Sequence, residues 1–239
     1  MFTIRMADIN ICIHNKYSYV ENMCRDYIIA ADGRIDFHIE VSAEEIGREQ
    51  AQADIPCSPD YCESICIYRA ISNQLIRYHA FLMHGACLEY HGNAYVFCAK
   101  SGTGKTTHLR LWKKVFGSDV HIINGDKPIL RARNNRFYVY GTPWCGKEGW
   151  NINTSAPLSA ICFLERSATN TIDTVPGSQV MGRLAHQILM PKEQGELIRY
   201  LDLMNLLISE TPCHLLRCNM EEEAARVAFT GLTKERNLL

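Results

Sequence analysis

Residues 95–112, with the sequence YVFCAKSGTGKTTHLRLW, constrain the fold of this chain more than any other segment. A short apolar run is followed by a glycine-rich loop and then by apolar residues at helical spacing. Residues 99–106 match the phosphate-loop pattern Gly-x-x-x-x-Gly-Lys-Ser/Thr, except that Ala99 stands at the first glycine position. A chance glycine-rich turn is the alternative, and the order of strand, loop and helix argues against it.

The loop has the residue types needed to hold a polyphosphate. Gly102 and Gly104 permit backbone conformations that turn successive amides toward an anion, and a helix beginning near Lys105 adds its positive N-terminal end. Lys105 is expected to reach the β- and γ-phosphates. The chain has no guanine-selecting Asn-Lys-x-Asp run, so ATP is favoured over GTP. The predicted nucleotide contacts are Ser101, Gly102, Thr103, Gly104, Lys105, Thr106 and Thr107.

A carboxylate follows the next apolar strand. Asp126 lies in VHIINGDKPIL, twenty positions beyond Thr106, where we expect the strand to end beside the loop. The Thr106 hydroxyl and Asp126 are therefore predicted to bind Mg²⁺, and Asp126 is also a candidate acceptor for the proton of an attacking hydroxyl. The alternative is a turn-forming aspartate in NGD. Lys127 is either a second phosphate contact or a solvated charge.

Charge and hydropathy exclude several classes of partner. Lys and Arg number 25 against 26 for Asp and Glu, so no net positive field favours nucleic acid or an anionic membrane. Apolar runs are too short to cross a bilayer, and residues 1–19 lack the apolar centre of a signal peptide. We expect a cytoplasmic protein and leave homo-oligomer formation open.

The eleven cysteines are interpreted as reduced. Their number is odd, and several lie in apolar runs where a thiol packs as a small hydrophobic group: Cys12, Cys66, Cys87, Cys98 and Cys162. Cys57, Cys62 and Cys66 lack obvious histidine partners, so packing is favoured over a zinc site.

Strands alternating with helices predict an α/β fold with a mixed sheet and helical cover. We expect a small N-terminal α/β lobe with its connecting helix at 1–79 and a phosphate-loop core at 80–239. Ser42 and Glu45 form a predicted capping box. Ser58 and Pro59 are expected to begin a long helix.

Apolar spacing predicts which helix faces are buried. In the 58–81 segment the predicted stripe is Ile65, Tyr68, Ser72, Leu75 and Ile76. The helix after the loop is expected to bury Leu109, Trp112 and Phe116. Two later helices have the predicted stripes Val180, Leu184 and Ile188, then Leu197, Leu201, Met204 and Ile208. Asn219 is the predicted cap of a last helix.

The motif order resembles the catalytic domain of the HPr serine kinase/phosphorylase family, which shares its phosphate-loop architecture with phosphoenolpyruvate carboxykinase. The resemblance rests on residues 80–165: a His84-Gly85 pair, the loop at 99–106, and Asp126 on the next strand. It implies that His84 lies near the transferred phosphoryl group and that Lys105 and Asp126 are catalytic. The chain has Gly125-Asp126 where that family usually has two adjacent aspartates, and it lacks the Glu-x-Arg-Gly signature of phosphorolysis.

The segment GTPWCGKEGWNIN, residues 141–153, places two tryptophans in a glycine-rich loop. Large rings on a polar loop need a covering partner, which is either a substrate or the loop itself. As candidate acceptor contacts we name Trp144, Lys147, Glu148 and Trp150, together with Arg166 as a phosphate contact.

These observations predict a kinase that uses ATP and Mg²⁺ to phosphorylate a hydroxyl, either a serine of a small protein or peptide or a hydroxylated metabolite. The alternative is a nucleotide-binding or nucleotide-hydrolysing switch that acts on a protein partner. Carboxykinase chemistry is disfavoured because no second metal set of Lys, His and Asp is evident.

Overall fold

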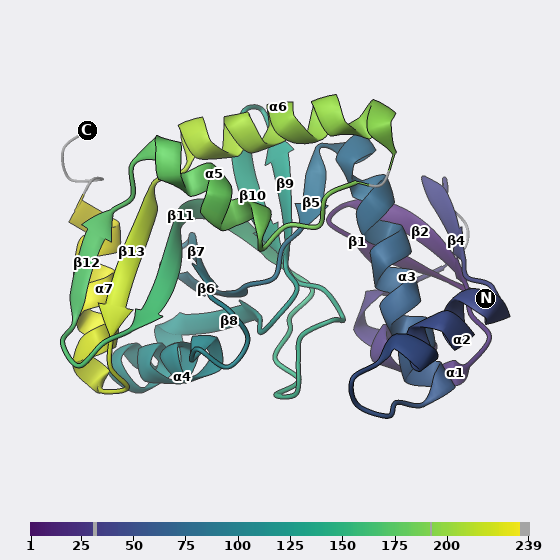
Figure 1. Ribbon diagram of the computed structural model, residues 1–239, viewed down its shortest axis with the longest axis horizontal. Coiled ribbons are helices and arrows are strands. Elements are labelled where there is room, and N and C mark those ends of the chain that lie inside the picture. Colours follow the sequence, from purple (N-terminus) through teal and green to yellow (C-terminus); the bar gives the residue numbers. More distant parts are fainter. Residues whose placement is uncertain (31–32, 192, 235–239) are drawn as a thin grey trace.

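The computed structural model describes residues 1–30, 33–191 and 193–234 of this mixed α/β chain. A four-stranded sheet lies near the N-terminus, with strand order β3-β1-β2-β4 (Figure 1). Its strands are β1 (Phe2–Met6), β2 (Ile9–His14), β3 (Ile28–Ile29) and β4 (Phe37–Glu40). The β2–β4 pair is parallel, whereas β1 pairs antiparallel with both β2 and β3.

Three helices accompany this sheet: α1 (Ser18–Met23), α2 (Ala43–Gln52) and α3 (Pro59–Leu75). The predicted capping box of α2 is confirmed: the Ser42 hydroxyl accepts from the Glu45 amide, and the Glu45 carboxylate accepts from the Ser42 amide. Helix α3 begins at Pro59 as predicted, although the Ser58 side chain caps no amide.

The second sheet has nine strands and is curled. Its path runs β5-β9-β10-β11-β7-β6-β8, and β13 pairs with β11 and β12. The strands are β5 (Ala80–Leu82), β6 (Ala86–Tyr90), β7 (Asn93–Cys98), β8 (Val120–Asn124), β9 (Ile129–Arg133), β10 (Arg136–Tyr140), β11 (Ser155–Arg166), β12 (Thr171–Thr174) and β13 (Cys213–Cys218). Strands β7, β11 and β13 are mutually parallel, and the other pairs are antiparallel.

Helices cover both faces of the part of the sheet around β7, β11 and β13 (Figure 1). On one face lie α4 (Lys105–Phe116) and α7 (Glu222–Lys234), whose aromatic and aliphatic residues pack around the fully buried Trp112. On the other face lie α5 (Gly177–Ala185) and α6 (Gln194–Glu210). The described residues also form three short 3-10 helices: Arg25–Tyr27, Ile76–Tyr78 and Gly117–Asp119.

The N-terminal part and the larger sheet share a hydrophobic core. One buried cluster joins Ile11 and Ile71 with Leu82, Ile129 and Trp144. The cluster crosses the expected boundary at residues 79 and 80, so the two parts pack against each other directly. Whether they are separate domains stays a prediction.

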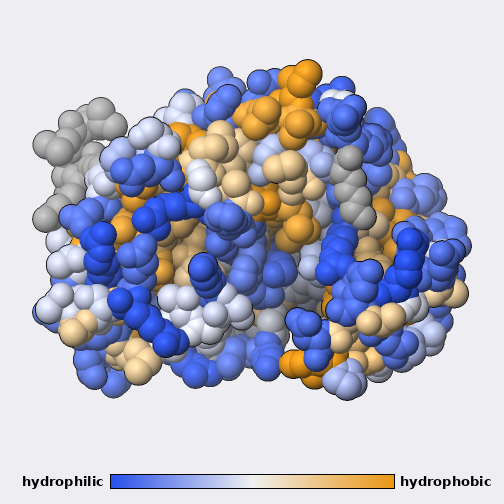
Figure 2. Space-filling model, in the orientation of Figure 1, coloured by the Kyte–Doolittle hydropathy of each residue, from blue (hydrophilic) through white to orange (hydrophobic). Residues whose placement is uncertain are grey.

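Several expected helix faces need correction. Helix α3 buries Ile67 and Ile71, whereas Ile65 and Tyr68 are only half-buried. The stripe predicted for α6 is wrong at Leu197 and Leu201, which are exposed because the helix turns Tyr200, Leu203, Met204 and Leu207 toward the sheet. Figure 2 shows apolar side chains gathered on the surface over α6, where Leu197, Ile198 and Leu201 are exposed. Ile188 is buried beyond the end of α5, in a bridge with Met83.

Candidate functional site

The glycine-rich loop leads from β7 into the N-terminus of α4. Gly102 and Gly104 have φ angles of 76° and 127°, and a Cβ on either would meet nothing within 4 Å. Backbone conformation, not crowding, therefore accounts for glycine at these positions. Within the described part of the chain, the amides of Gly102 and Gly104 have no hydrogen-bond partner, whereas the Thr103 amide donates to the Lys100 carbonyl at 3.2 Å.

Lys105 lies under this loop and is 8% exposed. Its Nζ donates to the Ala99 carbonyl at 3.0 Å and lies 3.2 Å from His84 Nε2. Burial lowers the pKa of the Lys105 amine, and the negative charge of Asp126 opposes that shift. A bound anion beside the ammonium would favour its charged form.

Asp126 follows β8 and reaches the same place. Its Oδ1 lies 3.3 Å from His84 Nε2 and its Oδ2 lies 3.4 Å from Lys127 Nζ. Burial raises the pKa of the Asp126 carboxyl, but the His84 hydrogen bond and the Lys127 charge outweigh burial, so the net pKa is lowered. From the sequence, the strand before Asp126 was expected to be a sheet neighbour of the strand before the loop. In the structure these strands are β8 and β7, and β6 lies between them.

Asn124 fixes the turn that carries Asp126, a role that the sequence analysis missed. The fully buried Asn124 accepts from the amides of Asp126 at 2.8 Å and Lys127 at 2.7 Å through Oδ1. Its Nδ2 donates to the Thr142 carbonyl at 2.9 Å. The Asn-Gly-Asp sequence is a turn signal that could have pointed to this residue.

The segment 141–153 packs directly on that turn. The Gly125 amide donates to the Trp150 carbonyl at 2.9 Å, and a Cβ on Gly125 would lie 2.6 Å from the Cys145 carbonyl oxygen. Position 125 therefore requires glycine, because any side chain would clash with the Cys145 carbonyl oxygen. The segment 141–153 is therefore packed tightly against the turn that carries Asp126.

The predicted acceptor contacts in this segment differ in environment. Trp144 is buried, packs on Tyr68, and donates from Nε1 to the Ser64 carbonyl at 3.2 Å. Lys147 and Glu148 are exposed, and Trp150 is half-buried. All four line a cavity of about 870 Å³. Their role as acceptor contacts stays a prediction.

This cavity brings all three predicted catalytic residues together. Its walls include His84, Lys105, Thr106 and Asp126, with the loop residues Ser101, Gly102 and Gly104 on one side. Helix α3 also lines the cavity, through Tyr61, Ser64, Ile65 and Tyr68. Residues of the N-terminal part and of the phosphate-loop part therefore line one site.

Two further cavities adjoin the loop. One of about 1100 Å³ lies beside Lys100, Ser101 and Arg166, and another of about 320 Å³ lies beside Thr103, Thr107 and Leu111. The exposed Arg166 donates to the carbonyls of Gly102 and Thr103, so it holds the loop from outside.

A family model described as "ScmC: SynChlorMet cassette protein ScmC" matches residues 62–222, which is more than half of the chain. The chain belongs to the ScmC family. The matched segment contains the glycine-rich loop, His84 and Asp126, and it leaves out β1 to β4. No curated protein matches the chain.

Among solved structures, the HPr(Ser) kinase/phosphatase from Coxiella burnetii matches with a TM-score of 0.37 and 9% identity. The alignment covers 66% of this chain and 96% of that protein. This likeness is too low to support an argument about function, so the HPr kinase resemblance stays a prediction. Among the described residues, the helices include none with the length and apolarity needed to cross a membrane.

Proposed function

We propose that this ScmC family member is a kinase that transfers the γ-phosphoryl group of ATP to a hydroxyl. The observation that carries the proposal is that His84 Nε2 lies 3.2 Å from Lys105 Nζ and 3.3 Å from Asp126 Oδ1. These groups lie beneath the glycine-rich loop, in which, within the described part of the chain, two glycine amides have no hydrogen-bond partner. Amides, an ammonium group and a helix N-terminus stabilise the charge of a transferring phosphoryl group.

The cavity of about 320 Å³ suits the nucleoside. It begins at Thr103 and Gly104 on the loop and extends past Leu111, Leu164 and Met220. A flat base needs an apolar slot of this kind, with few polar groups to orient it. The triphosphate would then pass over the loop toward Lys105, into the cavity of about 870 Å³ that contains Asp126.

The oxygen donors beside the loop fit Mg²⁺. Thr106 and Asp126 line the same cavity, and the lowered pKa of Asp126 keeps its carboxylate charged at neutral pH. These two residues would hold the ion. When bound, Mg²⁺ supplies positive charge next to the phosphates.

Asp126 is the proposed proton acceptor. The acceptor oxygen forms a bond to the γ-phosphorus, the bond from that phosphorus to the β-γ bridging oxygen breaks, and the hydroxyl proton passes to the Asp126 carboxylate. Tyr61, Tyr68 and Trp150 line the cavity and supply rings against which a peptide or a small hydroxylated molecule would pack.

One observation favours a nucleotide-dependent switch as a second candidate. Arg110 on α4 pairs with Glu148 at 2.6 Å and lies over the Trp150 ring, 5.5 Å from its centroid. A nucleotide that moves the start of α4 would thus act on the segment 141–153, which would present a changed surface to a protein partner.

Incubation with γ-labelled ATP and Mg²⁺ separates the two candidates. The panel of acceptors would contain serine peptides, HPr and small hydroxy acids. Label transferred to an acceptor supports the kinase, and label released only as phosphate supports the switch. Absence of any ATP binding or turnover contradicts both.

A further inference from the structure

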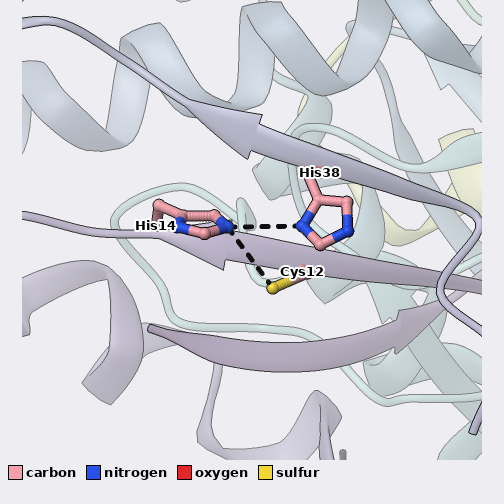
Figure 3. Close-up of side chains that lie close together, drawn as sticks. All are labelled: Cys12, His14 and His38. Atoms are coloured by element: carbon pink, nitrogen blue, oxygen red, sulfur yellow. Dashed lines mark hydrogen bonds between the residues drawn. The ribbon is translucent and has the colours of Figure 1, made fainter.

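A cluster of three side chains with metal-binding atoms lies in the N-terminal sheet, apart from the glycine-rich loop. Cys12 and His14 are two residues apart on β2, so both point to the same face of the sheet. His38 lies on β4, paired with Cys12 in the parallel register. Figure 3 shows the thiol and both imidazoles directed toward one point. From the sequence, Cys12 was expected to be a packing residue, and neither histidine was expected to have a role.

Two of the three distances between these atoms match those of a tetrahedral metal site. His14 Nε2 lies 3.3 Å from His38 Nδ1 and 3.7 Å from Cys12 Sγ. All three atoms lie within 4.8 Å of one another. With Zn–N of about 2.0–2.1 Å and Zn–S of about 2.3 Å, a tetrahedral ion separates two nitrogens by about 3.3 Å and a nitrogen from a sulfur by about 3.6 Å.

We propose that Cys12, His14 and His38 bind one Zn²⁺ ion, with water in the fourth position. The thiolate and the two imidazoles are the donor types that zinc prefers. Glu40 is paired with His14 across the same two strands and adds negative charge to this face of the sheet.

The site has a mechanical consequence for the fold. Strand β4 is at the edge of its sheet and is only four residues long. A metal that joins His38 to Cys12 and His14 would fasten this edge to β2. Because binding to the folded state alone stabilises it by mass action, Zn²⁺ should raise the unfolding temperature.

Cobalt is the probe that tests the site in the full chain. After removal of metals by a chelator, titration with Co²⁺ should give one bound ion per chain, with the visible bands of a tetrahedral site and a sulfur-to-cobalt band in the near ultraviolet. Excess Zn²⁺ should displace it. The proposal is wrong if the chain binds no Co²⁺ with a sulfur band.

Variants assign the ligands. His14→Ala and His38→Ala should each weaken Zn²⁺ binding by about 100-fold or more, since even loss of an outer-shell partner costs about 10- to 100-fold. Cys12→Ser should remove the sulfur band. The exposed side chain of His38 makes His38→Ala the variant most certain to fold, and circular dichroism would verify it.

Matched controls address the other thiols and histidines. His121→Ala changes an exposed strand histidine outside the cluster and should leave Co²⁺ binding unchanged. The thiols of Cys57 and Cys62 lie 2.8 Å apart and are the main rival ligands, so Cys57→Ser/Cys62→Ser should also bind one Co²⁺. Loss of the sulfur band in this double variant, with its retention in Cys12→Ser, would overturn the assignment.

Discussion

His84 Nε2 lies 3.3 Å from Asp126 Oδ1 and 3.2 Å from Lys105 Nζ, so one ring nitrogen faces both a carboxylate and an ammonium group. When Nε2 carries a proton, it donates to Asp126. When it does not, it accepts from Lys105. Whether Nε2 carries a hydrogen therefore decides which of the two proposed catalytic groups it is bonded to.

Substitution of His84 should raise the pKa of Asp126. In the folded chain, burial raises this pKa, and the His84 hydrogen bond and Lys127 charge lower it further than burial raises it. Removal of the imidazole in His84→Ala leaves burial less opposed, so the carboxyl titrates at a higher pH. A carbon-13 NMR titration of the Asp126 carboxyl would measure the shift.

The lowered pKa of Asp126 also makes the stability of the fold depend on pH. Because the folded pKa of Asp126 is below its ordinary value of 3.8, its stabilising contribution is present above that value and is lost as the pH falls through the folded pKa.

For the His84→Ala titration, His121→Ala is the control and should leave the Asp126 titration unchanged. An unchanged titration in His84→Ala would contradict the role assigned to the hydrogen bond.

Asp126→Asn tests the proposed proton acceptor. The amide has nearly the same shape but cannot accept the hydroxyl proton, so phosphoryl transfer should fall by about 10²-fold or more while ATP affinity changes little. Labelled transfer and equilibrium binding would be measured side by side. Asp119→Asn, at an exposed position after α4, should behave like the unmodified chain. Full transfer activity in Asp126→Asn would remove this residue from the mechanism.

Lys105→Met tests the proposed phosphate contact. Methionine fills a similar volume and removes the buried charge, so the fold should persist. Charged hydrogen bonds contribute about 1.5–3 kcal/mol, which predicts an ATP affinity about 10- to 100-fold lower. Isothermal titration calorimetry with ATP would measure the change, with the exposed Lys113→Met on the same helix as control. Equal affinities in the two variants would exclude Lys105 as a phosphate ligand.

Local sequence signals predicted the loop and its neighbours well. The order of strand, glycine loop and helix from β7 to α4 is confirmed. The β6–β7 hairpin turns at His91-Gly92, where both residues have positive φ. Gly117 ends α4 at a φ of 68°, a conformation that glycine adopts readily. Such features depend on residues close together in the chain, where spacing and backbone preference decide the outcome.

Long-range packing accounts for the errors. In α6 the sequence offers apolar residues on more than one side, and only the position of the sheet selects Tyr200 and Leu203 over Leu197 and Leu201. The part played by α3 in the cavity was likewise missed, because Tyr68 meets Trp144 only after the chain has folded. The Cys12, His14 and His38 cluster depends on pairing between β2 and β4, which no local pattern specifies.

His108 should make the fold less stable in mild acid. It is buried in α4, and its Nε2 accepts a hydrogen bond from Trp112 Nε1 at 3.0 Å. Burial lowers the pKa of His108 from 6.5 to about 3. The unfolded chain therefore binds an additional proton between these values, and the free energy of unfolding should fall by about 2 kcal/mol from pH 7 to pH 5 through this group.

The variant His108→Gln should remove that part of the pH dependence. The glutamine side chain offers an oxygen that can accept from Trp112 Nε1 and does not titrate. Urea unfolding at pH 7, 6 and 5 would give the free energies, with His121→Gln as the exposed control that keeps the slope of the unmodified chain. Because the folded pKa of His108 lies below the unfolded one, the gap between His108→Gln and the unmodified chain must shift in favour of the variant as the pH falls. Parallel curves for the two would show that His108 does not titrate on unfolding as its burial requires.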